Sequence, residues 1–106
     1  MIRAFNTDRN GHKFSEATRL AVWLKARKVP GYDAKLYRKD RCGAWMKWSD
    51  YGKTIPGGTG WEIDHKKPVA RGGLDLLENL QALQWQNNRS KGDDWPAINF
   101  CVMQSI

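Results

Sequence analysis

Residues 61–93 decide the fold, and they read WEIDHKKPVARGGLDLLENLQALQWQNNRSKGD. Residues 61–65 alternate apolar and polar side chains, a pattern that predicts a strand. A loop broken by Pro68 and by a Gly-Gly pair follows, and the short apolar run 80–83 suits the second strand of a hairpin. The polar run from residue 84 or 85 to Lys91, closed by a glycine, predicts a helix. The segment therefore predicts a hairpin followed directly by a helix.

The residues before this segment predict a mainly helical extension. Ser15 is the expected N-cap of a helix over 16–28, whose apolar residues recur at three- and four-residue spacing. Residues 33–37 are expected to form a shorter helix and 42–48 a strand, whereas no structure is assigned to 97–106.

Length and composition restrict the class of protein. One hundred and six residues suit one domain, expected over 1–106, with an N-terminal helical part of about 15–40 and a core of about 42–94. The hydrophobic content of 41% and the six tryptophans argue against disorder. No stretch approaches the roughly 20 apolar residues of a membrane-spanning helix. The first residues lack an apolar signal segment, so a cytoplasmic location is expected.

The charge of the chain is unevenly distributed. The formal net charge is +7, and residues 1–60 carry 13 basic and 5 acidic side chains, against 5 and 6 in residues 61–106. A positive field over half of a small domain attracts polyanions, nucleic acid first among them. The alternative is a basic surface without a partner, and charge alone does not decide between the two.

The cysteine count excludes two kinds of site. Cys42 and Cys101 are too few for a disulfide framework or for a zinc site of four thiolates. We expect two buried, reduced thiols, with a single disulfide as the alternative.

Four polar residues of this segment stand in a specific order. Asp64 and His65 are adjacent at a strand end, Asn79 follows His65 by fourteen residues, and Asn88 follows nine residues later in the predicted helix. Taken singly, these residues would be a polar strand end and two capping asparagines. Taken together, they resemble the HNH endonuclease family, in the variant whose last histidine is an asparagine. The resemblance implies an α+β fold whose core hairpin and helix are the ββα-metal unit, joined to an N-terminal helical extension.

The resemblance also implies a chemistry that suits these side chains. Phosphodiester hydrolysis needs stabilisation of the charge at phosphorus and a base for the attacking water. Asp64 and Asn88 supply the oxygen ligands that Mg²⁺, or Mn²⁺, prefers. His65 is the expected general base, and the family pattern implies that the backbone carbonyl of Asn79 orients its ring. The implied products are a 5′-phosphate and a 3′-hydroxyl.

One geometric condition accompanies this interpretation. Adjacent side chains on a regular strand point to opposite faces. Asp64 and His65 can address one site only if the strand twists, bulges or ends there, so we expect irregular backbone at 64–66.

The expected partner is DNA, most simply double-stranded. Basic side chains in and around the core are the candidates for contacts with its backbone: Lys66, Lys67, Arg71, Arg89 and Lys91. No base-reading module is recognisable, so a protein partner would have to supply sequence specificity. The resemblance is to small proteins of bacteria and their phages, and it implies action in a bacterial cell without a membrane partner.

The chain departs from many relatives at their structural zinc site. Where those proteins carry two CxxC pairs, this chain keeps only Cys42 of the first pair, and Gln84 and Asn87 stand at the second. Because tetrahedral structural zinc needs four ligands, no structural zinc is expected. Stability is instead assigned to tryptophan packing around the hairpin and helix, by Trp45, Trp48, Trp61 and Trp85.

Two other functions compete with the nuclease. One is a catalytically silent nucleic-acid-binding module on the same fold, and the other is a protein-interaction domain that uses exposed apolar surface. The joint presence of Asp64, His65, Asn79 and Asn88 favours the enzyme over both.

Overall fold

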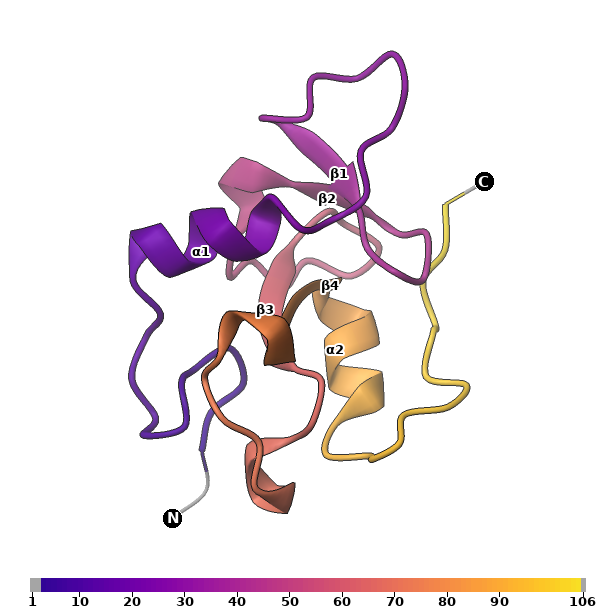
Figure 1. The fold of residues 1–106 in the computed structure, drawn as a ribbon. Coiled ribbons are helices and arrows are strands. Elements are labelled where there is room, and N and C mark those ends of the chain that lie inside the picture. Colours follow the sequence, from indigo (N-terminus) through magenta and orange to yellow (C-terminus); the bar gives the residue numbers. More distant parts are fainter. Residues whose placement is uncertain (1–2, 106) are drawn as a thin grey trace.

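The fold combines two antiparallel hairpins with two helices. We used a computed structural model, which describes residues 3–105 (Figure 1). In chain order the helices and strands are α1 (Glu16–Trp23), β1 (Tyr37–Lys39), β2 (Trp45–Lys47), β3 (Trp61–His65), β4 (Leu80–Gln84) and α2 (Trp85–Lys91). Strand β1 pairs with β2 and β3 with β4, so the chain is α+β as predicted.

The hairpin β3–β4 runs directly into α2. Its register places Trp61 opposite Gln84 and His65 opposite Leu80. Gln84 caps the helix, because its side-chain oxygen accepts hydrogen bonds from the backbone N–H groups of Gln86 and Asn87. Both strands and the helix lie where the sequence predicted them.

One apolar cluster joins α1 to both hairpins. Trp23 of α1 and Trp61 of β3 are fully buried, and their ring centroids are 5.1 Å apart. Met46 of β2 and Trp48 complete the contact between the layers. Trp45, which was predicted to pack at the hairpin, instead lies against Tyr32, with ring centroids 4.6 Å apart. The central tryptophan of the N-terminal part is therefore Trp23.

The N-terminal part is less helical than predicted. Ser15 caps α1 through the hydrogen bond that its hydroxyl accepts from the backbone of Thr18, but the helix ends at Trp23 instead of residue 28. Beyond it the backbones of Arg27 and Lys39 exchange two hydrogen bonds, which pull the chain out of the helical path. The short helix predicted over 33–37 is wrong as well, because this segment is a turn that leads into β1.

A buried carboxylate lies beside Gln84 and Asn87. Asp40 accepts hydrogen bonds from the backbone N–H of Gln84 at 2.9 Å and from the side-chain nitrogen of Asn87 at 3.0 Å. The amide oxygen of Asn87 accepts in turn from the backbone of Val102 and Met103, both at 2.8 Å. These side chains thus join the residue after β1, the junction of β4 with α2, and the C-terminal tail through hydrogen bonds. The absence of a structural zinc remains a prediction.

The cysteines form a disulfide, so the prediction of reduced thiols is wrong. Cys42 and Cys101 are joined across a sequence separation of 59 residues. The cause is the path of the tail, because the hydrogen bonds of Asn87 to residues 102–103 bring Cys101 alongside Cys42. The pairing could not be predicted while the tail had no assigned structure.

None of the helices within residues 3–105 is both long enough and apolar enough to cross a membrane.

Reduction should destabilise this fold and chelation should not. In the chain-entropy model, closing a loop across 59 residues contributes about 4 kcal/mol to the free energy of unfolding. We expect Cys101→Ser, or dithiothreitol, to lower the urea midpoint accordingly, whereas EDTA leaves it unchanged. The control is the urea midpoint of Cys101→Ser with and without reductant, which should be the same because this variant has no disulfide to reduce. A fold that EDTA unfolds would contradict the assignment of stability to the disulfide and the Asp40 hydrogen bonds.

Candidate functional site

Strand β3 carries polar side chains that are buried on both of its faces. Glu62, Asp64 and His65 expose at most 7% of their surface. The strand is regular through His65, and the chain bends at residues 66–67. The prediction of irregular backbone at 64–66 is therefore wrong for its first two residues. Asp64 and His65 stand on opposite faces of the hairpin.

Helix α2 covers the face that carries Asp64. One carboxylate oxygen of Asp64 accepts from the Gln81 side chain at 2.9 Å, and the other accepts from the Lys91 ammonium at 3.2 Å. Lys91 is 1% exposed and also donates to the backbone oxygen of His65 at 3.0 Å. Burial raises the pKa of Asp64, and the positive charge of Lys91 opposes that rise. Lys91 was predicted to bind a phosphate, but its buried ammonium instead holds the carboxylate.

Glu62 orients the helical asparagine. The side-chain nitrogen of Asn88 donates to Glu62 at 2.8 Å, which leaves the amide oxygen as the atom of Asn88 that can bind a cation. Arg89 holds the same carboxylate through two hydrogen bonds of 3.1 and 2.9 Å. These bonds raise the pKa of Arg89. The guanidinium predicted to contact DNA is thus bonded to Glu62, while the Arg89 side chain stays 39% exposed.

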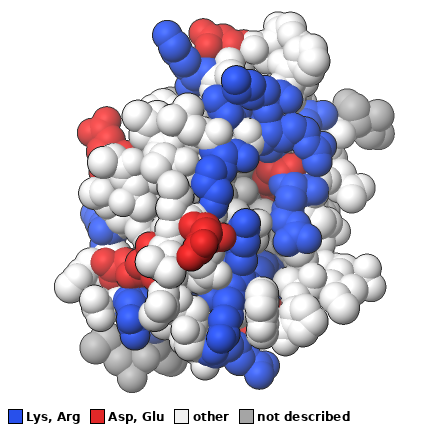
Figure 2. Space-filling view, viewed as in Figure 1, with Lys and Arg blue, Asp and Glu red and all other residues white. Residues whose placement is uncertain are grey.

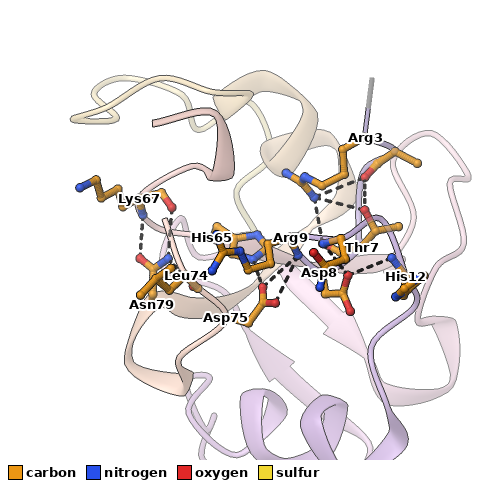
Figure 3. A network of polar contacts seen from close by, with 12 residues as sticks. Arg3, Thr7, Asp8, Arg9, His12, His65, Lys67, Leu74, Asp75 and Asn79 are labelled. Atoms are coloured by element: carbon orange, nitrogen blue, oxygen red, sulfur yellow. Dashed lines mark hydrogen bonds and ion pairs between the residues drawn. The ribbon is translucent and has the colours of Figure 1, made fainter. Parts of the chain in front are cut away.

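The ring of His65 is held by a carboxylate that the sequence did not indicate. Its Nε2 lies 2.7 Å from Asp75 Oδ1, and Asp75 also accepts from the backbone N–H of Arg9 at 3.1 Å (Figure 3). Because a carboxylate only accepts, the proton of the neutral ring is on Nε2 and the lone pair is on Nδ1. Asp75 lies in a loop between the strands, and no pattern in that loop distinguishes it.

Asn79 has a different contact from the one expected. Its carbonyl oxygen accepts from the backbone of Lys66 at 2.7 Å. The predicted bond from the His65 ring to this carbonyl is absent among the described residues, where the ring bonds to Asp75 instead. The Asn79 side chain accepts from Lys67 N–H at 2.8 Å and donates to the backbone oxygens of Lys67 and Leu74 (Figure 3). Asn79 thus closes the loop that carries Asp75, and Asp75 in turn bonds to the ring of His65.

One small pocket brings the predicted residues together. Asp64, His65 and Asn88 all line it. It lies at the outer edge of β3, where the backbone N–H of Ile63 donates to the Asn6 side chain at 2.8 Å. Side chains from both faces of a strand can reach its edge, so adjacent residues on opposite faces share one pocket. The pocket is completed by residues of the N-terminal segment, the loop after β3 and the end of α2: Arg3, Phe5, Pro68, Gly92 and Asp93.

The donor atoms of this pocket suit a hard cation. No group of three or more His, Cys, Asp or Glu side chains within residues 3–105 is arranged to hold a metal ion. The available pair is the Asp64 carboxylate and the Asn88 amide oxygen. Two oxygen ligands that leave room for water fit Mg²⁺ or Mn²⁺ better than Zn²⁺.

The remaining predicted DNA contacts lie in the loop after β3. Lys67 and Arg71 are exposed, and Lys66 is partly buried. These three residues, unlike Arg89 and Lys91, form none of the salt bridges found within residues 3–105.

Removing the buried ammonium should destabilise the fold through Asp64. We expect Lys91→Met to lower the free energy of unfolding by about 3 kcal/mol, because it leaves a buried carboxylate without its cation. The double variant Asp64→Asn/Lys91→Met should recover much of that loss. Urea unfolding measures both, with exposed Lys67→Met as the matched control. Equal stabilities of Lys91→Met and Lys67→Met would contradict the pairing.

Comparisons with known proteins give one family match. No match to the chain is found among curated proteins or among solved structures. The family model described as HNH endonuclease matches residues 41–94, which include β3, β4, α2 and every predicted site residue. The match covers half of the chain, so the chain belongs to the HNH endonuclease family.

Proposed function

We propose that the chain is a metal-dependent DNA endonuclease that hydrolyses phosphodiester bonds at the pocket beside β3. The observation that carries this proposal is the lining of that pocket by Asp64, His65 and Asn88 together. The family match supports a nuclease in general, and the divalent cation, the roles of the residues and DNA as substrate are our proposals.

His65 is the proposed general base. Its Nε2 proton faces Asp75, so the lone pair of Nδ1 can accept a proton from the attacking water. The carboxylate of Asp75 then stabilises the imidazolium that forms. Attack at phosphorus breaks the bond to the 3′ oxygen, which takes a proton from solvent, and the products are a 5′-phosphate and a 3′-hydroxyl.

Asp64 and Asn88 are the proposed ligands of one Mg²⁺ or Mn²⁺. A divalent cation bound there would stabilise the charge that develops on the phosphate and on the leaving oxygen. The hydrogen bond from Asn88 to Glu62 keeps the amide oxygen in the ligand orientation. Gln81 and Lys91 each donate to one carboxylate oxygen of Asp64, and each oxygen keeps a further lone pair for a cation.

The proposed substrate contacts are electrostatic. Lys66, Lys67 and Arg71 follow the strand that carries the base and can hold the backbone of the duplex. Contacts of this kind position a duplex without reading its sequence, so a protein partner would supply specificity. We place this activity in a bacterial cell, in a compartment that permits the Cys42–Cys101 disulfide. The alternative function is a silent nucleic-acid-binding module, which would have the same surface without cleavage.

A plasmid-nicking assay separates the two functions. With Mg²⁺, the wild-type protein should convert supercoiled plasmid to the open circle, and His65→Ala should lower the rate by about 100-fold or more, because it removes the base. DNA binding should persist in that variant. His12→Ala is the matched control, since it removes the other histidine of the chain from an exposed position. Equal rates in the two variants would contradict the proposal.

Asp75→Asn tests the positioning of His65. We expect kcat to fall about 10- to 100-fold while KM for DNA stays unchanged, because the variant loses the charge that fixes the ring. The melting temperature should be close to that of the wild type, since Asp75 lies in an exposed loop. Asp75→Glu should recover part of the rate. A change in KM alone would assign Asp75 to substrate binding instead.

A further inference from the structure

A second surface of the molecule has the chemistry of an anion-binding groove. It lies between the turn after α1, the end of β1 and strand β4, and we call it the basic groove. Its lining is Lys25, Ala26, Arg27, Lys39, Asp40, Arg41, Lys66, Gln81 and Ala82. Figure 2 shows the Lys and Arg side chains of this face gathered in a band.

The positive charge of the basic groove is not neutralised inside the protein. None of its cations forms a salt bridge with a carboxylate of residues 3–105. Asp40, the single acid of the lining, is 2% exposed, and its oxygens accept from Cys42, Ala44, Gln84 and Asn87. Burial lowers the pKa of Lys25, the charge of neighbouring Lys66 adds to this effect, and the charge of Glu78 opposes it.

Lys25 binds backbone oxygens of the protein, whereas Lys39 and Arg41 lie over aromatic rings. The Lys25 ammonium donates to the backbone oxygen of Leu80 at 2.6 Å and to that of Leu77, so it holds the edge of β4. Lys39 lies over the Trp45 ring at 4.8 Å and Arg41 over the Phe100 ring at 5.4 Å. The rings restrain these long side chains, which lowers the entropy that a ligand's binding would cost.

The groove and the candidate pocket lie at opposite edges of one hairpin. The pocket is at the outer edge of β3, and the contact of Lys25 with Leu80 places the groove at the outer edge of β4. Gln81 joins them, because it lines the groove and donates to Asp64. Paired strands are about 4.8 Å apart, and side chains extend beyond both outer edges of the hairpin. The two edges can therefore face the two backbones of a duplex, which are separated by grooves about 6–12 Å wide.

We infer that the basic groove binds the phosphate backbone of double-stranded DNA, on the strand opposite the one that enters the pocket. Two backbones can lie at the two edges of the hairpin at once, whereas a single strand can occupy only one edge. The groove lining also contains no aromatic side chain on which unpaired bases would stack. This inference rests on the proposed function for the direction of the DNA. Three of the groove's cations, Lys25, Arg27 and Lys39, lie outside the matched residues 41–94.

Binding measured without cleavage tests the inference. In EDTA, fluorescence anisotropy follows a labelled 20-base-pair duplex as salt is raised. The triple variant Arg27→Gln/Lys39→Gln/Arg41→Gln should bind roughly 100-fold more weakly at 0.1 M salt, and its slope of log K against log salt should fall by about 2.7. The matched control is Lys13→Gln/Lys35→Gln/Lys53→Gln, three exposed lysines outside the groove, which should change affinity less than about threefold.

Further variants guard against a folding artefact. Arg27→Lys/Arg41→Lys keeps the charge and should bind as the wild type does. The exposed single variant Arg41→Glu should weaken binding even if the triple variant does not fold.

Three results would overturn the inference. They are equal losses in the two triple variants, wild-type affinity in the groove triple, and tighter groove-dependent binding of a single strand or an RNA than of duplex DNA. A protein that binds through the groove but nicks no plasmid with Mg²⁺ would refute the proposed function alone. A protein that nicks while its groove triple binds normally would refute only the groove.

Discussion

The structure depends on the polar contact between β3 and α2. A strand buried on both faces carries Glu62 and Asp64, and a buried carboxylate without a partner costs several kcal/mol. The last turns of α2 supply the partners: Asn88 and Arg89 bind Glu62, and Lys91 binds Asp64. These bonds fix the helix against the hairpin in one arrangement. That arrangement places the Asp64 carboxylate and the Asn88 amide at one pocket.

Asp64 and His65 point to opposite faces of β3, yet both reach the pocket at the edge of this strand. Asp64 is oriented on the face toward α2, and His65 is oriented on the other face by Asp75. Neither residue needs a bulge, because the pocket opens at the strand edge between the faces. Asn79 closes the intervening loop and so sets where Asp75 stands. The carboxylate of Glu62 thus holds the proposed ligand Asn88 on one face of β3, and the carboxylate of Asp75 holds the proposed base His65 on the other.

The sequence predicted what local patterns determine. Alternation at 61–65, the glycine and proline of the loop and Gly92 after Lys91 are local signals, and β3, β4 and α2 lie at their predicted positions. The spacing of Asp64, His65 and Asn88 predicted that these residues share one site, because the short hairpin leaves few ways to arrange its strands and helix.

The errors of the sequence prediction lie where distant contacts decide. A lysine at the end of a polar helix ordinarily faces solvent, yet Lys91 is drawn inward by Asp64, 27 residues earlier. The partner of His65 was assigned to the Asn79 carbonyl, because nothing in the loop sequence shows that the backbone of Arg9 holds Asp75 nearby. The disulfide depends on a tail without regular structure, which Asn87 fixes. Each of these contacts required the tertiary structure.

We propose that Asp64 and Asn88 together hold one divalent cation beside His65. Electron paramagnetic resonance of free Mn²⁺ in a titration with protein measures this without requiring catalysis. We expect one bound Mn²⁺ per wild-type chain, loss of that binding in Asp64→Asn and in Asn88→Ala, and its retention in His65→Ala. Mn²⁺ binding of equal affinity in the wild type, Asp64→Asn and Asn88→Ala would contradict the account.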